Sequence, residues 1–139
     1  MAYKINLPLG KGWSIEQELI DENGEDVLAW YADNEENGCS IELYVGNTPE
    51  DSDAKEECIN SYIEVIGVEN EDEEIPVFDI PFLGATGWYY DAQDDEGSPV
   101  VMICVEPREG VFVMAIISHR SEEGLDELIT YVDENLVVE

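Results

Sequence analysis

The sequence predicts a single α+β domain, in which an antiparallel sheet of about six to seven strands is flanked by two main helices. About seven short segments either alternate apolar and polar residues or are apolar throughout, as strands do. Two further segments repeat apolar residues at intervals of three and four, as amphipathic helices do. The 139 residues are 44% hydrophobic, which is enough for one core. We therefore expect one domain over residues 1–139.

The N-terminal part is expected to form an antiparallel meander of three strands. In the first strand, Trp13, Ile15 and Leu19 share one face and polar residues share the other, which is typical of a sheet with one solvated face. Clusters of Asp, Glu, Asn and Gly at 21–24 and 34–38 predict the two turns. The expected strands are 13–20, 27–33 and 39–45.

A helix of about four turns is expected to follow the meander. Residues 47–50 combine a capping residue, a proline and an acid, which is the chemistry of a helix start. Apolar residues then recur at helical spacing until Gly67, which ends the helix. Segment 69–74 has no apolar side chain, so we expect a solvated connection.

Four strands and a second helix complete the predicted order of strand ×3, helix, strand ×4, helix. Pro76 and Pro81 place the first of these strands at a sheet edge, because proline cannot donate a ladder hydrogen bond. The last two are apolar on both faces, as central strands are. Ser121 is positioned to cap the closing helix. The strands are 75–80, 86–91, 100–105 and 111–117, and the helix carries Leu125, Leu128, Ile129, Val132 and Leu136.

The charge excludes two classes of partner. The chain has 35 Asp and Glu against 5 Lys and Arg, a formal net charge of -30. Such a field repels the phosphates of nucleic acids and the anionic headgroups of membranes, so we expect neither as a partner. The sequence shows no apolar run long enough for a signal peptide or a membrane span, which predicts a cytoplasmic location.

The sequence contains no spacing pattern typical of a catalytic nucleophile or of paired thiols. Cys39, Cys58 and Cys104 lack C-x-x-C spacing and lie in apolar patterns, so we expect small buried side chains. The single histidine, His119, lies between the last strand and the last helix, and no serine has a G-x-S-x-G context. We therefore predict no catalytic residue.

The carboxylates offer no defined site either. Asp79 is the least solvated of them by context, and the alternation of an edge strand accounts for it. The best match to a calcium-binding loop begins at Asp33, but Tyr44 stands where the twelfth position requires Glu. Similar turns beginning at Asp21 and Asp91 lack the glycine needed at the sixth position. The sequence predicts no metal site and no cofactor.

Adjacent aromatic residues in strands supply the candidate binding residues, because one ring of each set must face away from its neighbour. Either one ring packs beneath a helix while the other is partly exposed, or the rings form a recognition surface, for which Trp and Tyr are favoured anchors. The candidates are Trp30, Tyr31, Trp88, Tyr89 and Tyr90.

Segment 5–13, Ile-Asn-Leu-Pro-Leu-Gly-Lys-Gly-Trp, resembles the opening of domains with the PsbP-like fold. The two apolar strands 100–105 and 111–117, followed by the helix from Ser121, resemble the way these domains close. The fold is shared by photosystem II extrinsic proteins, a small Ran-binding nuclear import factor and many bacterial domains. The chain departs from the pattern at 133–136, where many relatives have a serine followed by an apolar residue, and no secretion or lipoprotein signal precedes the domain. The resemblance implies a bacterial member with a binding or assembly role, and it places no functional residue.

The leading hypothesis is a non-catalytic acidic binding protein that engages a basic protein partner, for example an immunity or inhibitor protein of a toxin. We expect a monomer or a weak homo-oligomer. Two alternatives stay open: a small hydrolase-like enzyme that uses His119 and a carboxylate, and a structural or chaperone-like homo-oligomer.

Overall fold

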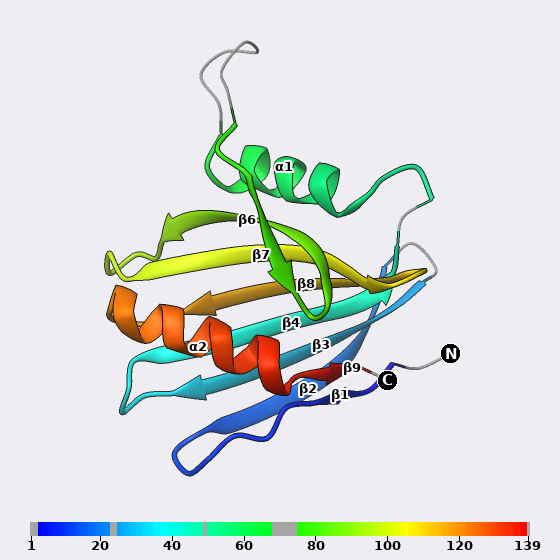
Figure 1. The fold of residues 1–139 in the computed structure, drawn as a ribbon. Helices are drawn as coiled ribbons and strands as arrows, with labels where there is room; N and C mark the ends of the chain where they lie inside the picture. The colour runs from blue at the N-terminus through cyan, green and yellow to red at the C-terminus, as the bar shows by residue number, and fades with distance from the viewer. Residues whose placement is uncertain (1–2, 23–24, 49, 68–74, 139) are drawn as a thin grey trace.

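The described part of the chain holds two helices and nine strands, arranged as an α+β domain (Figure 1). The computed structural model describes residues 3–22, 25–48, 50–67 and 75–138. The elements are β1 (Ile5–Asn6), β2 (Ser14–Glu22), β3 (Glu25–Asn34), β4 (Cys39–Asn47), α1 (Ala54–Val65), β5 (Phe78–Phe82), β6 (Ala85–Gln93), β7 (Pro99–Arg108), β8 (Val111–Ser118), α2 (Glu122–Asn135) and β9 (Val137–Val138).

Seven strands form one antiparallel sheet in the order β2-β3-β4-β8-β7-β6-β5, in agreement with the predicted α+β class. The most apolar strands, β7 and β8, lie inside the sheet, and β2 and β5 are its edges. The short strands β1 and β9 pair with each other as a second, two-stranded sheet, which the sequence did not predict. In Figure 1, β1 and β9 lie side by side.

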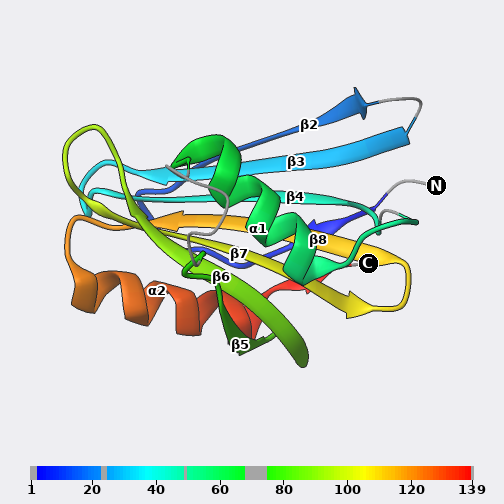
Figure 2. The ribbon, with the colours of Figure 1, turned by 90° about the horizontal axis from the view of Figure 1, so that it is seen from above.

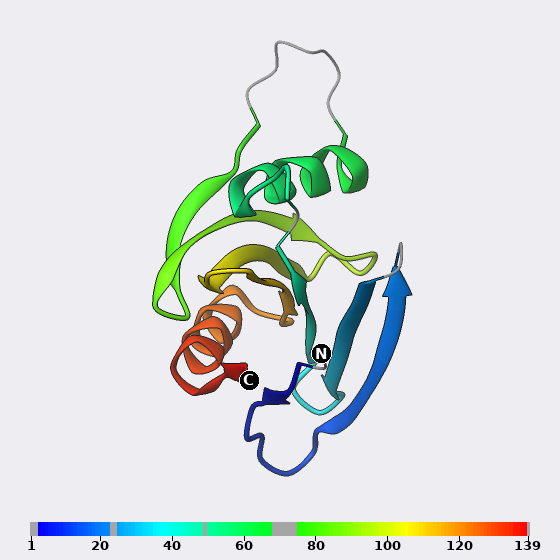
Figure 3. The same ribbon diagram turned by 90° about the vertical axis from the view of Figure 1, so that its right-hand side faces the viewer.

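The inner face of the large sheet curls around α2 and the β1–β9 pair (Figure 3). Leu125, Val132 and Leu136 are buried against alternate residues of β3, β4, β7 and β8. The strict alternation of β4, in which Ile41 and Leu43 are fully buried, produces this inner face. Each fully buried Leu or Ile side chain contributes about 1.5–3 kcal/mol by leaving water.

The outer face is covered by α1 over β6 and β7. Cys58 of α1 is fully buried against Cys104 and Met102 of β7 and Tyr90 of β6. The Tyr90 and Ser61 hydroxyl groups are hydrogen-bonded at 2.9 Å, which satisfies a polar group beneath the helix. All three cysteines are buried and free, as their apolar contexts predicted.

The structure corrects several local predictions. The first helix does not begin at 47–50: Asn47 still belongs to β4, and Asp53 caps α1 by accepting the backbone N–H of Glu56 at 2.9 Å. The edge strand is Phe78–Phe82 rather than 75–80, with Pro81 inside it and Asp79 exposed.

The first strand also differs from its prediction in burial. Ile15 and Leu19 lie on the inner side of β2, but they are 49% and 59% exposed. Seen from above (Figure 2), α2 runs along one side of the molecule and β2 along the other, so the helix does not reach this strand. The apolar face of β2 is therefore solvent-accessible.

The acidic connection predicted at 69–74 lies outside the described residues. Within the described ranges, neither helix is long and apolar enough to cross a bilayer.

Candidate functional site

The structure separates the five aromatic residues that the sequence selected. Trp30 is 4% exposed on the inner face, and Tyr90 is 2% exposed beneath α1, so both belong to the core. Their burial leaves them no surface to offer a partner. Tyr31, Trp88 and Tyr89 are partly exposed.

Trp88 and Tyr89 lie on opposite faces of β6 and do not form one surface. Trp88 packs at the edge of the α1 contact, where the Lys55 ammonium group lies 4.8 Å from the centre of its ring. This cation–π contact occupies one ring face from within the chain. Tyr89 is on the inner side, with its ring 5.9 Å from that of Phe78. Of the five candidates, Tyr31 alone therefore lies on the part of the outer face beyond α1.

The strand register brings further residues to Tyr31 on this outer face. Directly paired positions form one row that runs from Glu16 through Tyr31 and Glu42 to Ile116. The next row runs from Glu18 through Ala29 and Tyr44 to Met114, and Phe112 follows on β8. We call this surface the open sheet face; it consists of Glu16, Glu18, Tyr31, Glu42, Tyr44, Phe112, Met114 and Ile116.

The polarity of the open sheet face changes from β2 to β8. Acids predominate on β2, tyrosines on β3 and β4, and apolar side chains on β8, where they continue into the cluster beneath α1. The tyrosine and β8 side chains are half-buried, so each exposes only part of its surface. It combines an apolar floor with an acidic margin.

Two tyrosines form the centre of this face. The rings of Tyr31 and Tyr44 meet edge to face, with centroids 6.0 Å apart and an interplanar angle of 84°. The Tyr31 hydroxyl donates to Glu18 at 3.4 Å, and the Tyr44 hydroxyl donates to Glu42 at 3.3 Å. Both bonds are longer than the usual O–H···O distance, so a partner group that offers a better acceptor can replace them.

Tyr44 is held in its neutral form. Burial raises the pKa of Tyr44 above its ordinary value, and the neighbouring Tyr31 hydroxyl and Glu42 carboxylate raise it further. The phenol consequently remains a hydrogen-bond donor well above neutral pH, while the surrounding glutamates are acceptors. The face therefore offers an amphipathic anchor next to negative charge.

Two of the five Lys and Arg residues make contacts away from this margin. Lys55 lies on Trp88, and Arg120 donates to the backbone oxygens of Asn37 and Glu36 in the β3–β4 turn. None of the eight residues of the open sheet face is basic. The glutamates of this face are therefore available to counterions or to the basic groups of a partner.

Sequence reasoning did not select Tyr44, Phe112 or Met114 as site residues. The signal for Tyr44 was present, because it shares the solvated side of its strand with Ser40 and Glu42. What was missing was the order of the strands, which places β4 between β3 and β8.

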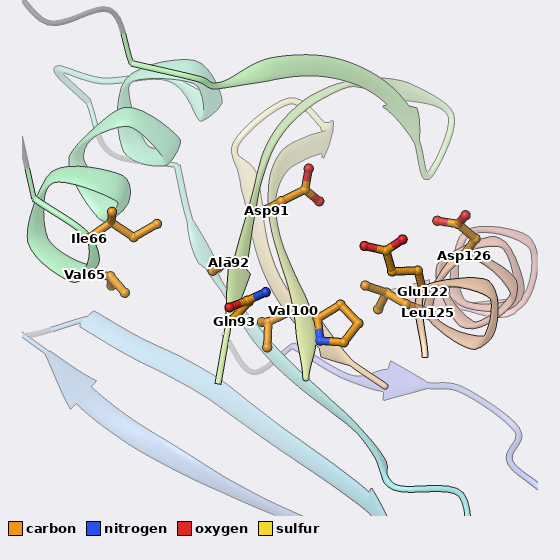
Figure 4. Close-up of a pocket in the computed structure, with 10 residues that line it drawn as sticks. Val65, Ile66, Asp91, Ala92, Gln93, Val100, Glu122, Leu125 and Asp126 are labelled. Carbon is orange, nitrogen blue, oxygen red and sulfur yellow. The ribbon is translucent and has the colours of Figure 1, made fainter. Parts of the chain in front are cut away.

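A second acidic feature is a pocket of about 720 Å³ at the end of β6 (Figure 4). Because β5 pairs with β6 only as far as Tyr89, the following residues of β6 form a sheet edge in the described structure. The end of α1 borders the pocket on one side and the start of α2 on the other (Figure 4). Its lining comprises Val65, Ile66, Asp91, Ala92, Gln93, Pro99, Val100, Glu122, Leu125 and Asp126.

The pocket suits a cationic group attached to an apolar stem. Asp91, Glu122 and Asp126 supply negative charge, and Ile66 and Leu125 supply apolar wall. Lysine and arginine side chains combine these two properties. Within the described ranges no cluster of three or more acids, histidines or cysteines is spaced to hold a metal ion.

His119 has a structural role at the start of α2. Its Nδ1 accepts the backbone N–H of Ser121 at 3.1 Å, and its ring packs against Gly124. Ser121 in turn caps the helix by accepting the Gly124 N–H at 3.1 Å. These contacts place His119 at the helix start, where its Nδ1 also lies 3.4 Å from the Ser121 hydroxyl oxygen.

No protein-family model, curated protein or solved structure shows significant similarity to the chain.

Proposed function

We propose that this chain is a non-catalytic acidic binding protein that engages a basic protein partner through the open sheet face. The observation that carries the proposal is the Tyr31–Tyr44 pair, which lies between Glu16, Glu18 and Glu42 with no basic residue on the same face. This arrangement joins an aromatic anchor to a group of glutamates.

The two components act at different stages of binding. The glutamates and the net charge of -30 attract a basic surface from a distance, which raises association rates by about 10- to 1,000-fold at low salt. The tyrosines and the apolar side chains of β8 act after contact, because their burial by a partner slows dissociation. Aromatic residues at the centre of an interface, surrounded by polar groups, are the usual arrangement of binding hot spots.

The specific form that we propose is an immunity or inhibitor protein of a toxin whose active site is basic, such as a nuclease. An enzyme that binds phosphates needs Lys and Arg in its site, and an acidic surface competes for them directly. We also propose that the chain acts as a monomer, since self-association through this face would bring glutamates together.

The PsbP-like resemblance belongs to the same proposal. The opening segment, with its glycine and tryptophan leading into the first strand, and the closing pair of apolar strands followed by a helix support a relationship to that fold. Its characterised members act mostly through partners, which agrees with a binding role. The function itself is argued from the open sheet face, because fold alone does not determine function.

The test begins with capture of the partner from cells of the source organism on the immobilised chain at low salt, with elution at about 0.5 M salt, where charge attraction is screened. The eluted protein is then purified, and its Kd is measured for wild type, for a Tyr31→Ala/Tyr44→Ala double variant and for Phe78→Ala. Phe78 is a matched control because it is an exposed aromatic residue of edge strand β5, outside the open sheet face.

We expect a basic partner whose Kd rises by about tenfold or more for the double variant and by about twofold or less for the control. If the partner is a toxin, equimolar chain should also block its activity. Retention of no basic protein at low salt would contradict the proposal, as would equal affinity for wild type and the double variant.

A further inference from the structure

Strand β2 is a long and regular edge strand whose charged side chains are all acidic. It pairs with β3 over all nine residues, Ser14 to Glu22, without a register shift. Its sequence, Ser-Ile-Glu-Gln-Glu-Leu-Ile-Asp-Glu, contains no proline, glycine or lysine. Natural edge strands are commonly short, bulged, or protected by proline or charged side chains, because their free N–H and C=O groups otherwise accept a further strand. The acids of β2 oppose the addition of an acidic strand but not of a basic one.

The opposite edge of the sheet shows this protection. Strand β5 has five residues and carries Pro81, so it offers a shorter and interrupted template. In Figure 3, β2 forms the outer end of the curled sheet, with no described segment along its free edge. Residues 14–19 of β2 are all exposed.

The two faces of β2 specify what kind of strand fits. Ile15 and Leu19 face the inner side and are exposed there, so an added strand can cover them with apolar residues. Glu16 and Glu18 face the outer side and attract basic residues at the positions opposite them. A second copy of β2 in the same place would set glutamates near glutamates, which opposes self-pairing.

The geometry points to β2 as the docking edge for an extended segment of a basic partner, in which apolar and basic residues alternate. Such a segment adds an eighth strand beside β2, with its apolar side chains over Ile15 and Leu19 and its Lys or Arg side chains beside Glu16 and Glu18. It also extends the open sheet face by one strand, because both glutamates belong to that face. The inference rests on the proposed function only in requiring a basic partner.

The experiment uses the full chain and an eight-residue peptide of alternating valine and lysine as the probe. A second peptide has the same sequence and charge but carries N-methyl groups on alternate backbone amides, which removes the donors that pair with an edge strand. Binding is measured by titration at low salt, and amide hydrogen exchange is followed over residues 14–22.

Two charge-reversal variants separate the edge from general attraction. Glu16→Lys/Glu18→Lys alters the outer side of β2, and Glu127→Lys/Glu134→Lys makes the same change in net charge at exposed positions of α2. We expect the plain peptide to slow exchange in β2 and to bind about tenfold more tightly than the methylated peptide. The β2 variant should lose this binding, and the α2 variant should largely retain it.

Each other outcome has a definite meaning. Equal binding of both peptides with unchanged exchange in β2 would overturn strand addition and leave the engagement of basic partners intact. Equal weakening of peptide binding in the β2 and α2 charge variants would also overturn strand addition and leave the engagement of basic partners intact. Absence of binding by either peptide at low salt would overturn strand addition, whereas the proposed function is tested separately by the partner Kd of the Tyr31→Ala/Tyr44→Ala variant.

Discussion

A methyl group added at Gly124 tests whether His119 is a structural residue of the α2 start. In most helices, Gly→Ala stabilises the protein by about 0.5–1 kcal/mol, because alanine loses less backbone entropy on folding. In this helix, the Cβ of an alanine at position 124 would overlap the Cε1, Nδ1 and Nε2 atoms of the His119 ring. The two effects have opposite signs.

The net effect can be worked from the contacts of the ring. To make room, His119 must leave Gly124 and give up the hydrogen bond from the Ser121 N–H, which is worth about 1 kcal/mol. Displacing a packed ring costs about a further 1 kcal/mol. After the gain in helix propensity is subtracted, we expect Gly124→Ala to lower the free energy of unfolding by about 1 kcal/mol, or about 3 °C in Tm.

The assay is urea unfolding of wild type, Gly124→Ala, His119→Ala and the double variant. With His119 truncated, Gly124→Ala should become stabilising by about 0.5–1 kcal/mol, so the cycle shows a coupling of about 1.5–2 kcal/mol. A stabilising Gly124→Ala in the presence of His119 would refute the placement of this ring against Gly124.

Three further predictions concern the whole protein. Tm should rise between about 10 and 500 mM salt, because screening relieves repulsion among the acids; a flat Tm would mean local compensation. Asp133→Ala should lower the free energy of unfolding by about 1.5 kcal/mol in urea titrations. The reason is that Asp133 Oδ1 accepts the Leu83 N–H at 2.6 Å, in a turn where Leu83 has φ 53°. An unchanged urea midpoint would contradict this hydrogen bond. The free energy of unfolding should fall above about pH 8.5, because a hydrogen bond with Cys58 and burial raise the pKa of Cys104, so the folded chain keeps a thiol proton that the unfolded chain loses. Cys104→Ala should reduce the slope of the free energy of unfolding against pH, and equal slopes in the two proteins would exclude the effect.

The alternation of apolar residues predicted the large sheet well, because its signal is local. The period of two in β4 and the apolar runs of β7 and β8 are readable within about ten residues. The pairing of β1 with β9 was not readable, since Ile5 meets Val138 from the other end of the chain and each strand has two residues. Such a pair depends on contacts between segments that are far apart in the sequence.

The start of α1 shows how two local signals compete. Residues 47–50 carry cap chemistry, but the backbone of Asn47 is paired with Val111 of β8. The expected cap residue is therefore the last residue of strand β4. Asp53 then supplies the cap actually used. Pairing between distant segments therefore decides between caps that the sequence alone cannot rank.

The candidate site was only partly predictable for the same reason. Tyr31 was selected because a strand must turn one of two adjacent aromatics outward. Its partner Tyr44 and the neighbouring Met114 belong to the face only because β3, β4 and β8 are adjacent. Trp30 and Tyr90 looked equivalent to Tyr31 in sequence and proved to be core residues, because the faces they occupy are covered.

The central claim is that charge brings a basic partner to the open sheet face and that Tyr31 and Tyr44 hold it there. The most direct measurement is the pair of rate constants for the purified partner with wild type and with Tyr31→Ala/Tyr44→Ala, at low salt and at about 0.5 M salt. We predict that salt lowers the association rate constant of both proteins alike, and that the double variant raises the dissociation rate constant by about tenfold at either salt. A salt-independent association rate, or an unchanged dissociation rate in the double variant, would contradict the account.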